Sequence, residues 1–484
     1  MKDPRILSAS FIVLFFSLVL GILIFNWPFR QQFPTEFVHV GVAQQFAQGR
    51  QPYQNFYDKV VPLARYTPGF YLLPAALGKL LHAEQSPVWF LRIFRYTSWG
   101  LGFLAIGGLI QLKRRETGSA FLAVAAGALW LCCGGFIFYK ARGDWMSAWF
   151  VFLAYHQLNQ GTEARRIVWA AFFSALAFLF KINVFPLFFA ASFWLLLGHK
   201  KKKALGFSAL YLGIVFTVMI FFNAISGGWA SRMILEVNAG MPRNFLFPFK
   251  FLFIQNPLSG YFVCLALTSL ICSFKKIDFK SKEGLLVFYF LFALIQYLLT
   301  AQSIGAAIHH LLDTGLATAL VLITACHHEW FPFHFRWGKG LLIFPLAAAL
   351  LLTNAGIWRG VFHGRMPEES GDRFTKQWEF FSGLSASKIL TDVPEIAFRA
   401  NQPESAMEVD YYADMLLPKK VLNLQSWKEQ FRAQPFEMIL SERKGPLEKL
   451  GLEAWQLYYK EERLIPDQTG GPNVQVWIKK RAAI

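Results

Sequence analysis

Long runs of apolar residues, separated by short charged loops, dominate the first three quarters of this chain. A helix needs about 20 apolar residues to cross the roughly 30 Å hydrocarbon core of a membrane, and residues 1–358 contain about eleven segments near that length. The expected spans are 6–27, 92–112, 119–139, 145–160, 167–181, 184–198, 204–222, 258–273, 284–300, 309–325 and 341–358. The pattern therefore predicts a polytopic α-helical membrane protein with about eleven transmembrane helices.

Basic residues gather in every second loop between these spans. The basic clusters are Lys113-Arg114-Arg115, Arg165-Arg166, the lysines at 200–203, Lys275-Lys276, and Arg336 with Lys339. Because cytoplasmic loops collect Lys and Arg, these loops and the N-terminus, with Lys2 and Arg5, are predicted to be cytoplasmic. The first apolar run lacks a small-residue cleavage site and is interpreted as an uncleaved span. Segments 28–91, 223–257 and 359–484 then lie on the outer side of the membrane, which we expect to be a bacterial inner (plasma) membrane.

The composition agrees with this interpretation. Of the 484 residues, 55% are hydrophobic and only 16% are charged, which is less charge than a soluble protein usually carries. The formal net charge of +18 fits basic cytoplasmic loops better than nucleic-acid binding, for which no motif is present. The five cysteines lie in or beside apolar segments, so no disulfide framework is expected.

The outer segments differ from one another in pattern. In 28–91, the stretch 66–82 is apolar but short, and it is predicted to form a juxtamembrane helix along the interface, as is 241–257. The tail alternates short apolar runs at 388–393, 420–424, 436–441 and 474–478 with helix-like stretches. This predicts two domains, a transmembrane domain over 1–358 and a small extracytoplasmic α/β domain over 359–484.

Glu36 follows the first span, in the sequence FPTEFVHVG. A carboxylate close to the outer membrane surface can act as general base on an acceptor hydroxyl while the leaving group stays in the lipid. The alternative is a solvated loop glutamate.

The sequence KARGDWMSAWF places Lys140, Arg142 and Asp144 at the outer ends of the third and fourth spans. Two cations and a carboxylate at an interface suit a phosphate-bearing ligand with a polar acceptor or a metal. The alternative is a pair of snorkelling cations with Asp144 as a helix cap.

Two further groups of ionisable residues lie on the same face. Asp58, Lys59 and Arg65, in NFYDKVVPLARYTPGFY, form a group that is predicted either to bind an anionic group or to anchor an interfacial helix. His309, His310 and Asp313 open the tenth span, and His309 and Asp313 share one helical face. An ionisable residue inside a span is a functional candidate, although a structural hydrogen bond would also explain it.

Taken in order, these pieces resemble the GT-C superfamily of membrane glycosyltransferases that use polyprenyl-phosphate sugars. The likeness is greatest to the bacterial branch related to protein mannosyltransferases and the aminoarabinose transferase of lipid A. Its motifs correspond to Glu36 after the first span, RYTPGFYLLPAAL, the Arg-rich second span, ARGDWMSAWF at the fourth span and SIGAAIHHLLD. The chain departs from the family pattern at Glu36-Phe37, where Asp, often Asp-Glu, is usual, at Gly143, where Pro is usual, and at His309-His310, where Asn-Tyr is usual.

The resemblance implies a GT-C-like fold and an inverting hexosyl or pentosyl transferase at the outer face of the membrane. The donor would be a polyprenyl-phosphate sugar, and the acceptor hydroxyl would belong to a glycan, a lipid or a protein. Glu36 and Asp144 would be catalytic, and they would also hold a divalent metal, Mg²⁺ or Mn²⁺, if the reaction uses one. Arg65, Lys140 and Arg142 would bind the donor phosphate, and Asp58, His309, His310 and Asp313 are further candidates for substrate binding.

Two other functions remain open at this point. A transporter or lipid flippase would also be polytopic, but such proteins often show inverted repeats, and none is evident in this sequence. A non-catalytic scaffold that kept the fold is the other alternative, because fold alone does not imply function.

Overall fold

The structure of this chain is a computed structural model. The structure describes residues 11–20, 34–55, 64–83, 86–134, 143–239, 243–302, 308–328, 342–348 and 350–351, four strands between 389 and 479, and a few single positions. Predicted positions Asp58, Lys140 and Arg142 lie outside the described residues, as does the apolar run 420–424.

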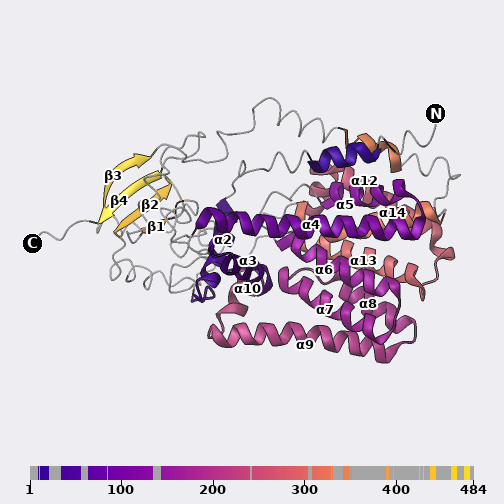
Figure 1. Cartoon of the computed structure of the whole chain (residues 1–484), viewed down its shortest axis with the longest axis horizontal. Coiled ribbons are helices and arrows are strands. Elements are labelled where there is room, and N and C mark those ends of the chain that lie inside the picture. Colours follow the sequence, from indigo (N-terminus) through magenta and orange to yellow (C-terminus); the bar gives the residue numbers. More distant parts are fainter. Residues whose placement is uncertain are drawn as a thin grey trace, which may run out of the picture.

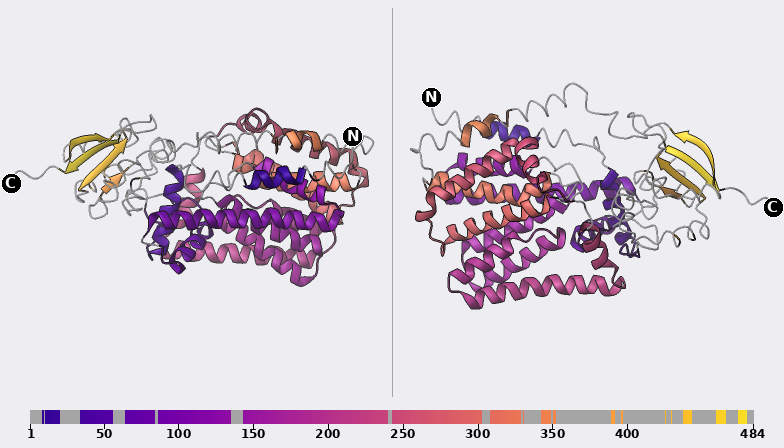
Figure 2. Two further views of the ribbon diagram at one scale, coloured as in Figure 1. Left: turned by 45° about the horizontal axis from the view of Figure 1, so that its top comes forward. Right: turned by 180° about the vertical axis from the view of Figure 1, so that it is seen from behind.

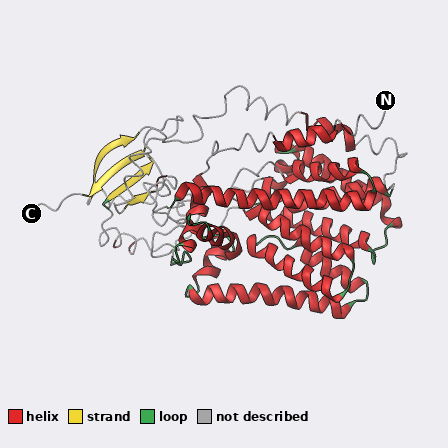
Figure 3. Ribbon diagram, in the orientation of Figure 1, coloured by secondary structure: helices red, strands yellow, loops and turns green. Residues whose placement is uncertain are grey.

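Helices make up most of the described chain (Figure 1; Figure 3). Those at the predicted spans are α4 (Pro87–Thr117), α5 (Ala120–Gly134), α6 (Gly143–Gln160), α7 (Ala164–Phe180), α8 (Pro186–Leu197), α9 (Lys201–Ile225), α12 (Pro257–Ser273), α13 (Lys282–Thr300) and α14 (Leu312–His327). Residues 11–20 and 342–348 are also helical, at the first and the last predicted span. A helix is therefore described at each of the predicted positions.

Four of the described helices are long and apolar enough to cross a membrane. They are Trp89–Thr117, Lys201–Ile225, Pro257–Lys276 and Lys282–Thr300. Four shorter apolar helices accompany them: Phe11–Leu20, Ala120–Cys133, Pro186–Leu197 and Leu312–His327. The prediction of an integral membrane protein is supported by these helices, whereas the number of eleven spans stays a prediction.

Polar contacts join the ends of helices far apart in sequence. At one end of the bundle, the Lys113 ammonium of α4 donates to the Thr324 hydroxyl of α14 at 3.3 Å and pairs with Glu116 at 2.7 Å. The amide of Asn159, at the end of α6, donates to Glu116 at 2.5 Å. We call this end the Lys113 end, and it lies next to several of the basic loops, since Lys203 donates to the Thr162 carbonyl oxygen there.

At the other end, which we call the Asp144 end, α6 begins and α7 finishes. Asp144 in the first turn of α6 forms an ion pair with Lys181, the residue after α7. The Thr67 hydroxyl, just before α3 (Pro68–Leu80), donates to the Phe178 carbonyl oxygen of α7 at 3.2 Å. Among the described residues, Asp144 and Lys181 thus lie at the opposite end of α6 and α7 from the basic residues Arg165 and Arg166.

Small residues allow the helices of the core to approach closely. A side chain added at Gly127 of α5 would meet Ile110 of α4 at 2.9 Å, and one added at Gly108 of α4 would meet the ring of Phe152 on α6. Close approach at small residues is typical of helix packing in membranes. The arrangement of α4, α5 and α6 is therefore specified by shape as well as by hydrophobicity.

Shorter helices lie beside the bundle at the Asp144 end. The predicted interfacial stretch 66–82 contains α3, and α2 (Pro34–Ala47) precedes it. Loop 223–257 contains α10 (Trp229–Ala239), which the sequence did not predict, then α11 (Phe247–Lys250) and the π-helix η2 (Phe251–Gln255).

A four-stranded sheet follows in the tail. Its strands are β1 (Ile389–Thr391), β2 (Met438–Glu442), β3 (Tyr459–Ile465) and β4 (Val474–Lys479). Their order is β1-β2-β4-β3, with β1 and β2 parallel and the other pairs antiparallel. Leu390 and Ile439 belong to the same buried cluster as Phe37 and Phe70, so the sheet packs at the end of the bundle where α2 and α3 lie (Figure 2). The division into two domains at residue 358 stays a prediction.

Candidate active site

A buried ion pair forms the centre of the candidate site. Asp144 is 3% exposed and Lys181 is 7% exposed, and the Lys181 ammonium contacts the Asp144 carboxylate directly. A carboxylate in the first turn of a helix is stabilised by the helix dipole, which favours Asp144 in its charged form. A buried charge needs such a partner, because an unpaired one is strongly destabilising.

The residue before Asp144 explains how closely α6 approaches its neighbours. A side chain at Gly143 would come within 2.8 Å of the Phe180 carbonyl oxygen and 2.9 Å of the Phe70 ring. Any Cβ at this position would therefore push the start of α6 away from α3 and α7. The departure from the usual Pro of the GT-C motif thus has a steric reason in this chain.

Arg65 is held at the same end by the short segment before α3. Its side chain is 8% exposed, and its guanidinium lies 5.7 Å from the centre of the Tyr66 ring. The Tyr53 hydroxyl donates to the Tyr66 carbonyl oxygen at 2.9 Å, and Thr67 binds the end of α7. The segment is thus fixed on both sides of Arg65, within a few residues of Lys181.

Helix α2 brings its first turn to this segment. The ring of His39 packs edge-on against Tyr66 at 4.8 Å and against Phe70 at 5.7 Å between ring centroids. Glu36 lies one helical turn before His39, and residues three apart share a face of a helix. The backbone of Glu36 is therefore near the Arg65 segment, while its side chain lies outside the described residues.

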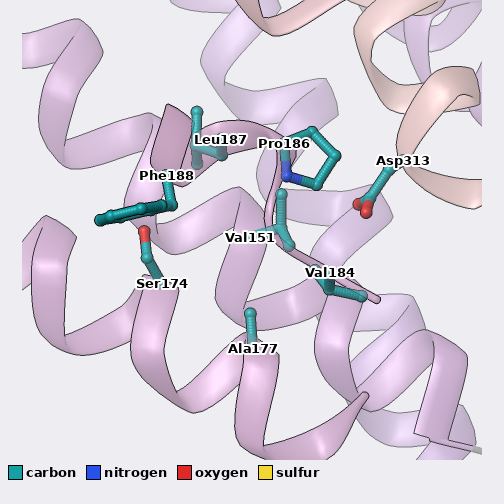
Figure 4. Close-up of a pocket in the computed structure, with 8 residues that line it drawn as sticks. All are labelled: Val151, Ser174, Ala177, Val184, Pro186, Leu187, Phe188 and Asp313. Atoms are coloured by element: carbon teal, nitrogen blue, oxygen red, sulfur yellow. The ribbon is translucent and has the colours of Figure 1, made fainter. Parts of the chain in front are cut away.

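Asp313 enters the site from the first turn of α14. Its side chain is 8% exposed and lines a small pocket with Val184, from the loop after Lys181, and Pro186, the first residue of α8 (Figure 4). The Asp313 carboxyl interacts electrostatically with Lys181, with Asp144 and with Tyr289 of α13. The structure thus brings together two of the predicted residues, Asp144 and Asp313, which are far apart in sequence, and it places the segment that carries Arg65 against the end of α7.

His310 lies beside the same loop. Its Nδ1 is 3.1 Å from the Thr300 hydroxyl and 3.4 Å from the Asn183 side-chain amide. These contacts join the ends of α13 and α14 to the residue two positions after Lys181. His309 is in the short helix η4 (Ile308–Leu311), and its side chain is outside the described residues.

Lys181 and Tyr289 are the residues that the sequence analysis missed. Lys181 was the last residue of the predicted span 167–181, and a lysine at the predicted outer end of a span is unusual when basic residues gather on the other side. That position was a usable signal. Tyr289 gave none, because a tyrosine within an apolar run resembles any other core aromatic.

A divalent metal finds limited support among the described residues. No group of three or more His, Cys, Asp and Glu side chains gathers in that part of the chain. Asp144 supplies one carboxylate, and Lys181 already neutralises it. Metal binding by Glu36 and Asp144 therefore stays a prediction.

Comparison with known proteins was made through both sequence and structure. No protein-family profile matches the chain, and no curated protein sequence matches it either. Two crystal structures of ArnT from Cupriavidus metallidurans are similar in fold, one bound to undecaprenyl phosphate with a TM-score of 0.64 and one in the apo state with 0.62. They are 12% and 13% identical to this chain, covering 98% and 97% of it and 98% of each ArnT chain.

The chain has the GT-C fold. A second GT-C protein, the archaeal oligosaccharyltransferase AglB from Archaeoglobus fulgidus, was solved with an inhibitory peptide and a dolichol-phosphate. It has a TM-score of 0.52 and 13% identity over 97% of this chain and 74% of its own. The GT-C resemblance that the motifs suggested is thereby confirmed at the level of fold over nearly the whole chain.

Proposed function

We propose that this protein is a membrane glycosyltransferase that moves a sugar from a polyprenyl-phosphate donor to an acceptor hydroxyl, with inversion at the anomeric carbon. The observation that carries the proposal is the buried Asp144–Lys181 pair, with Asp313 close to it and the Arg65 segment against the end of α7, at one end of a GT-C fold. The similar ArnT structure was solved with undecaprenyl phosphate, and AglB with dolichol-phosphate, which supports a lipid phosphate as the donor carrier.

The donor phosphate would be bound by the cations of this end. When the bond between the anomeric carbon and the phosphate oxygen breaks, polyprenyl phosphate leaves with an added negative charge. Cations fixed in a site of low dielectric stabilise such charge as it develops. We assign this role to Arg65 and Lys181, and to Lys140 and Arg142 by their positions in the sequence.

The acceptor would be activated by a carboxylate. In this proposal Glu36 takes the proton of the acceptor hydroxyl, and the acceptor oxygen bonds to the anomeric carbon opposite the departing phosphate. Asp144 orients the acceptor. A divalent metal held by Glu36 and Asp144 would supply further stabilisation of the phosphate charge.

The remaining assignments concern the setting of the reaction. The Asp144 end would face the outer side of a bacterial inner membrane, with the N-terminus and the basic loops in the cytoplasm. The donor would enter sideways from the outer leaflet, and residues 359–484 would shape the acceptor cleft as an extracytoplasmic domain. The acceptor is a glycan, a lipid or a protein.

The test uses purified protein in lipid nanodiscs with a panel of polyprenyl-phosphate sugars, and it measures released polyprenyl phosphate. We expect release by the wild type, and loss of it in Glu36→Gln and Lys181→Met. Lys113→Met is the matched control, because Lys113 is a buried lysine paired with an acid at the opposite end. At a temperature where it is folded, its rate should stay within about twofold of wild type, since distant sites act independently.

Other outcomes would favour the alternatives. Folded wild type that releases nothing across a broad panel, but moves labelled lipid between leaflets, would indicate a flippase. Silence in both assays would indicate a scaffold. Equal loss in Lys181→Met and Lys113→Met would mean that stability, and not the site, explains the effect of Lys181.

A further inference from the structure

The candidate site contains more acids than its central lysine can neutralise at one time. Lys181 is paired with Asp144, while Asp313 lies close enough to interact electrostatically with both. All three are at least nine-tenths buried. Among the described residues, the carboxylates of Asp144 and Asp313, each on a different helix, therefore share the surroundings of the Lys181 ammonium group.

The apolar surroundings make the position of Asp313 unusual. Six of the other residues that line its pocket are apolar, and Ser174 is the remaining polar one (Figure 4). In the picture, the Asp313 carboxylate lies beside Pro186, the first residue of α8, and above Val184, on the loop that begins at Lys181. An acid in an apolar helix is costly, and such residues usually have a functional partner.

The Asp144–Lys181 pair creates a difficulty for catalysis. Neither group can bind substrate fully while each is bound to the other. When one partner of a buried ion pair departs, the charge left behind loses that partner, at a cost in free energy. A second carboxylate near Lys181 would remove most of that cost.

We propose that Asp313 is a positioning residue that acts through Lys181, as the alternative counterion that receives the lysine when Asp144 turns to the substrate. The proposal deepens the transferase function and rests on it. In the free protein Lys181 binds Asp144. With donor and acceptor bound, Asp144 engages the acceptor. Lys181 then contacts the donor phosphate, and Asp313 serves as the counterion of Lys181.

A purely structural role for Asp313 makes different predictions. A first-turn aspartate stabilises its own helix through the dipole, and Asp313→Asn would then lower the melting temperature and leave the kinetics of the folded fraction unchanged. If Asp313 is instead the alternative counterion, Asp313→Asn slows the step in which Asp144 leaves Lys181. Its signature is a fall in kcat with little change in the KM for the donor.

The first experiment measures both kinetic constants in nanodiscs. For Asp313→Asn we expect kcat to fall roughly 10- to 100-fold, as for other losses of positioning. The KM for the donor should stay within about threefold of wild type, and Asp313→Glu should recover a large part of kcat. Thr318→Val, a near-isosteric change at a buried residue of the same helix, should keep the wild-type kcat. Wild-type kcat in Asp313→Asn, or no recovery in Asp313→Glu, would overturn the proposal.

The second experiment does not depend on activity. Melting temperatures in detergent are compared for wild type, Lys181→Met, Asp313→Asn and the double variant. If the two groups interact, the double variant melts at a higher temperature than the sum of the single shifts predicts. Additive shifts would overturn the assignment of Asp313 as a counterion, even if the transferase function holds. A wild type that is inactive on all donors would instead contradict the transferase function, and with it the catalytic role of the pair.

Discussion

The indole nitrogen of Trp130, on α5, donates a hydrogen bond of 2.9 Å to the backbone carbonyl oxygen of Leu312. Leu312 is the first residue of α14 and directly precedes Asp313. This bond lies in the buried core, and it ties the start of α14 to a helix that does not itself carry a candidate residue. The position of Asp313 therefore depends on α5 as well as on its own helix.

Trp130→Phe removes this bond and leaves the Leu312 carbonyl without its donor. An unsatisfied buried polar group costs about 1–3 kcal/mol, to which the smaller ring adds a cavity. We expect a lower melting temperature and a reduced transfer rate through displacement of Asp313. Trp149→Phe, at a half-buried tryptophan of α6, is the control. Equal effects of the two variants on rate would contradict the role of the bond.

Gly143→Ala tests the close contact at the start of α6. The added Cβ would lie 2.8 Å from the Phe180 carbonyl oxygen, so α6 must shift and carry Asp144 with it. Small displacements of a positioned group cost up to about 100-fold in rate, and we expect a loss of rate greater than the loss of stability. Gly206→Ala on α9 is matched, because the space around Gly206 is open, and it should raise stability by about 1 kcal/mol. The measurements are the transfer rates and melting temperatures of both variants. A Gly143→Ala variant that keeps the wild-type rate would contradict the prediction.

Thr67→Val removes the hydrogen bond from α3 to the end of α7. The Phe178 carbonyl oxygen then loses its donor, at about 1–2 kcal/mol, and the Arg65 segment is held on one side only. Because Arg65 is proposed to bind the donor phosphate, we expect the KM for the donor to rise. A higher KM with unchanged kcat would support that role. An unchanged KM would argue against Arg65 as a donor ligand.

Tyr53 predicts a dependence of stability on alkaline pH. Burial, and then the neighbouring Tyr71, raise the pKa of Tyr53 well above its usual value of 10.0. In the unfolded chain the phenol ionises near pH 10, whereas in the fold it stays neutral and donates to Tyr66. This stability is fully present below about pH 10 and is lost as the pH rises above it. Melting temperatures between pH 8 and 11 should therefore fall less steeply in Tyr53→Phe than in wild type, and parallel curves would contradict the assignment.

The hydrophobic pattern was sufficient to predict where the long helices lie, because a membrane span needs a run of apolar residues whatever its neighbours. The same pattern missed α10, Trp229–Ala239, because its mixture of polar and apolar residues is typical of a loop. In the structure α10 packs in the same buried cluster as Phe222. The pattern also missed β3, because YKEERLI carries four charges and does not alternate in the way that a half-buried strand does.

The site was predictable in part for a related reason. Charge patterning placed Arg65, Asp144 and Asp313 on one side, and the structure brings Asp144 and Asp313 together there, with the Arg65 segment attached to the end of α7. It was not sufficient to pair Lys181 with Asp144, because that contact depends on how α6 and α7 pack. Which helix ends meet is a property of the tertiary fold, and single-sequence periodicity does not report it.

The two polar contacts at opposite ends of α6 restrict what this helix is able to do. Asp144 fixes its start to Lys181, and Asn159 fixes its end to Glu116. A slide of one turn, about 5.4 Å along the axis, would break both attachments together. In the free protein helix α6 is thus attached at both of its ends, and both contacts oppose a movement of the helix along its axis.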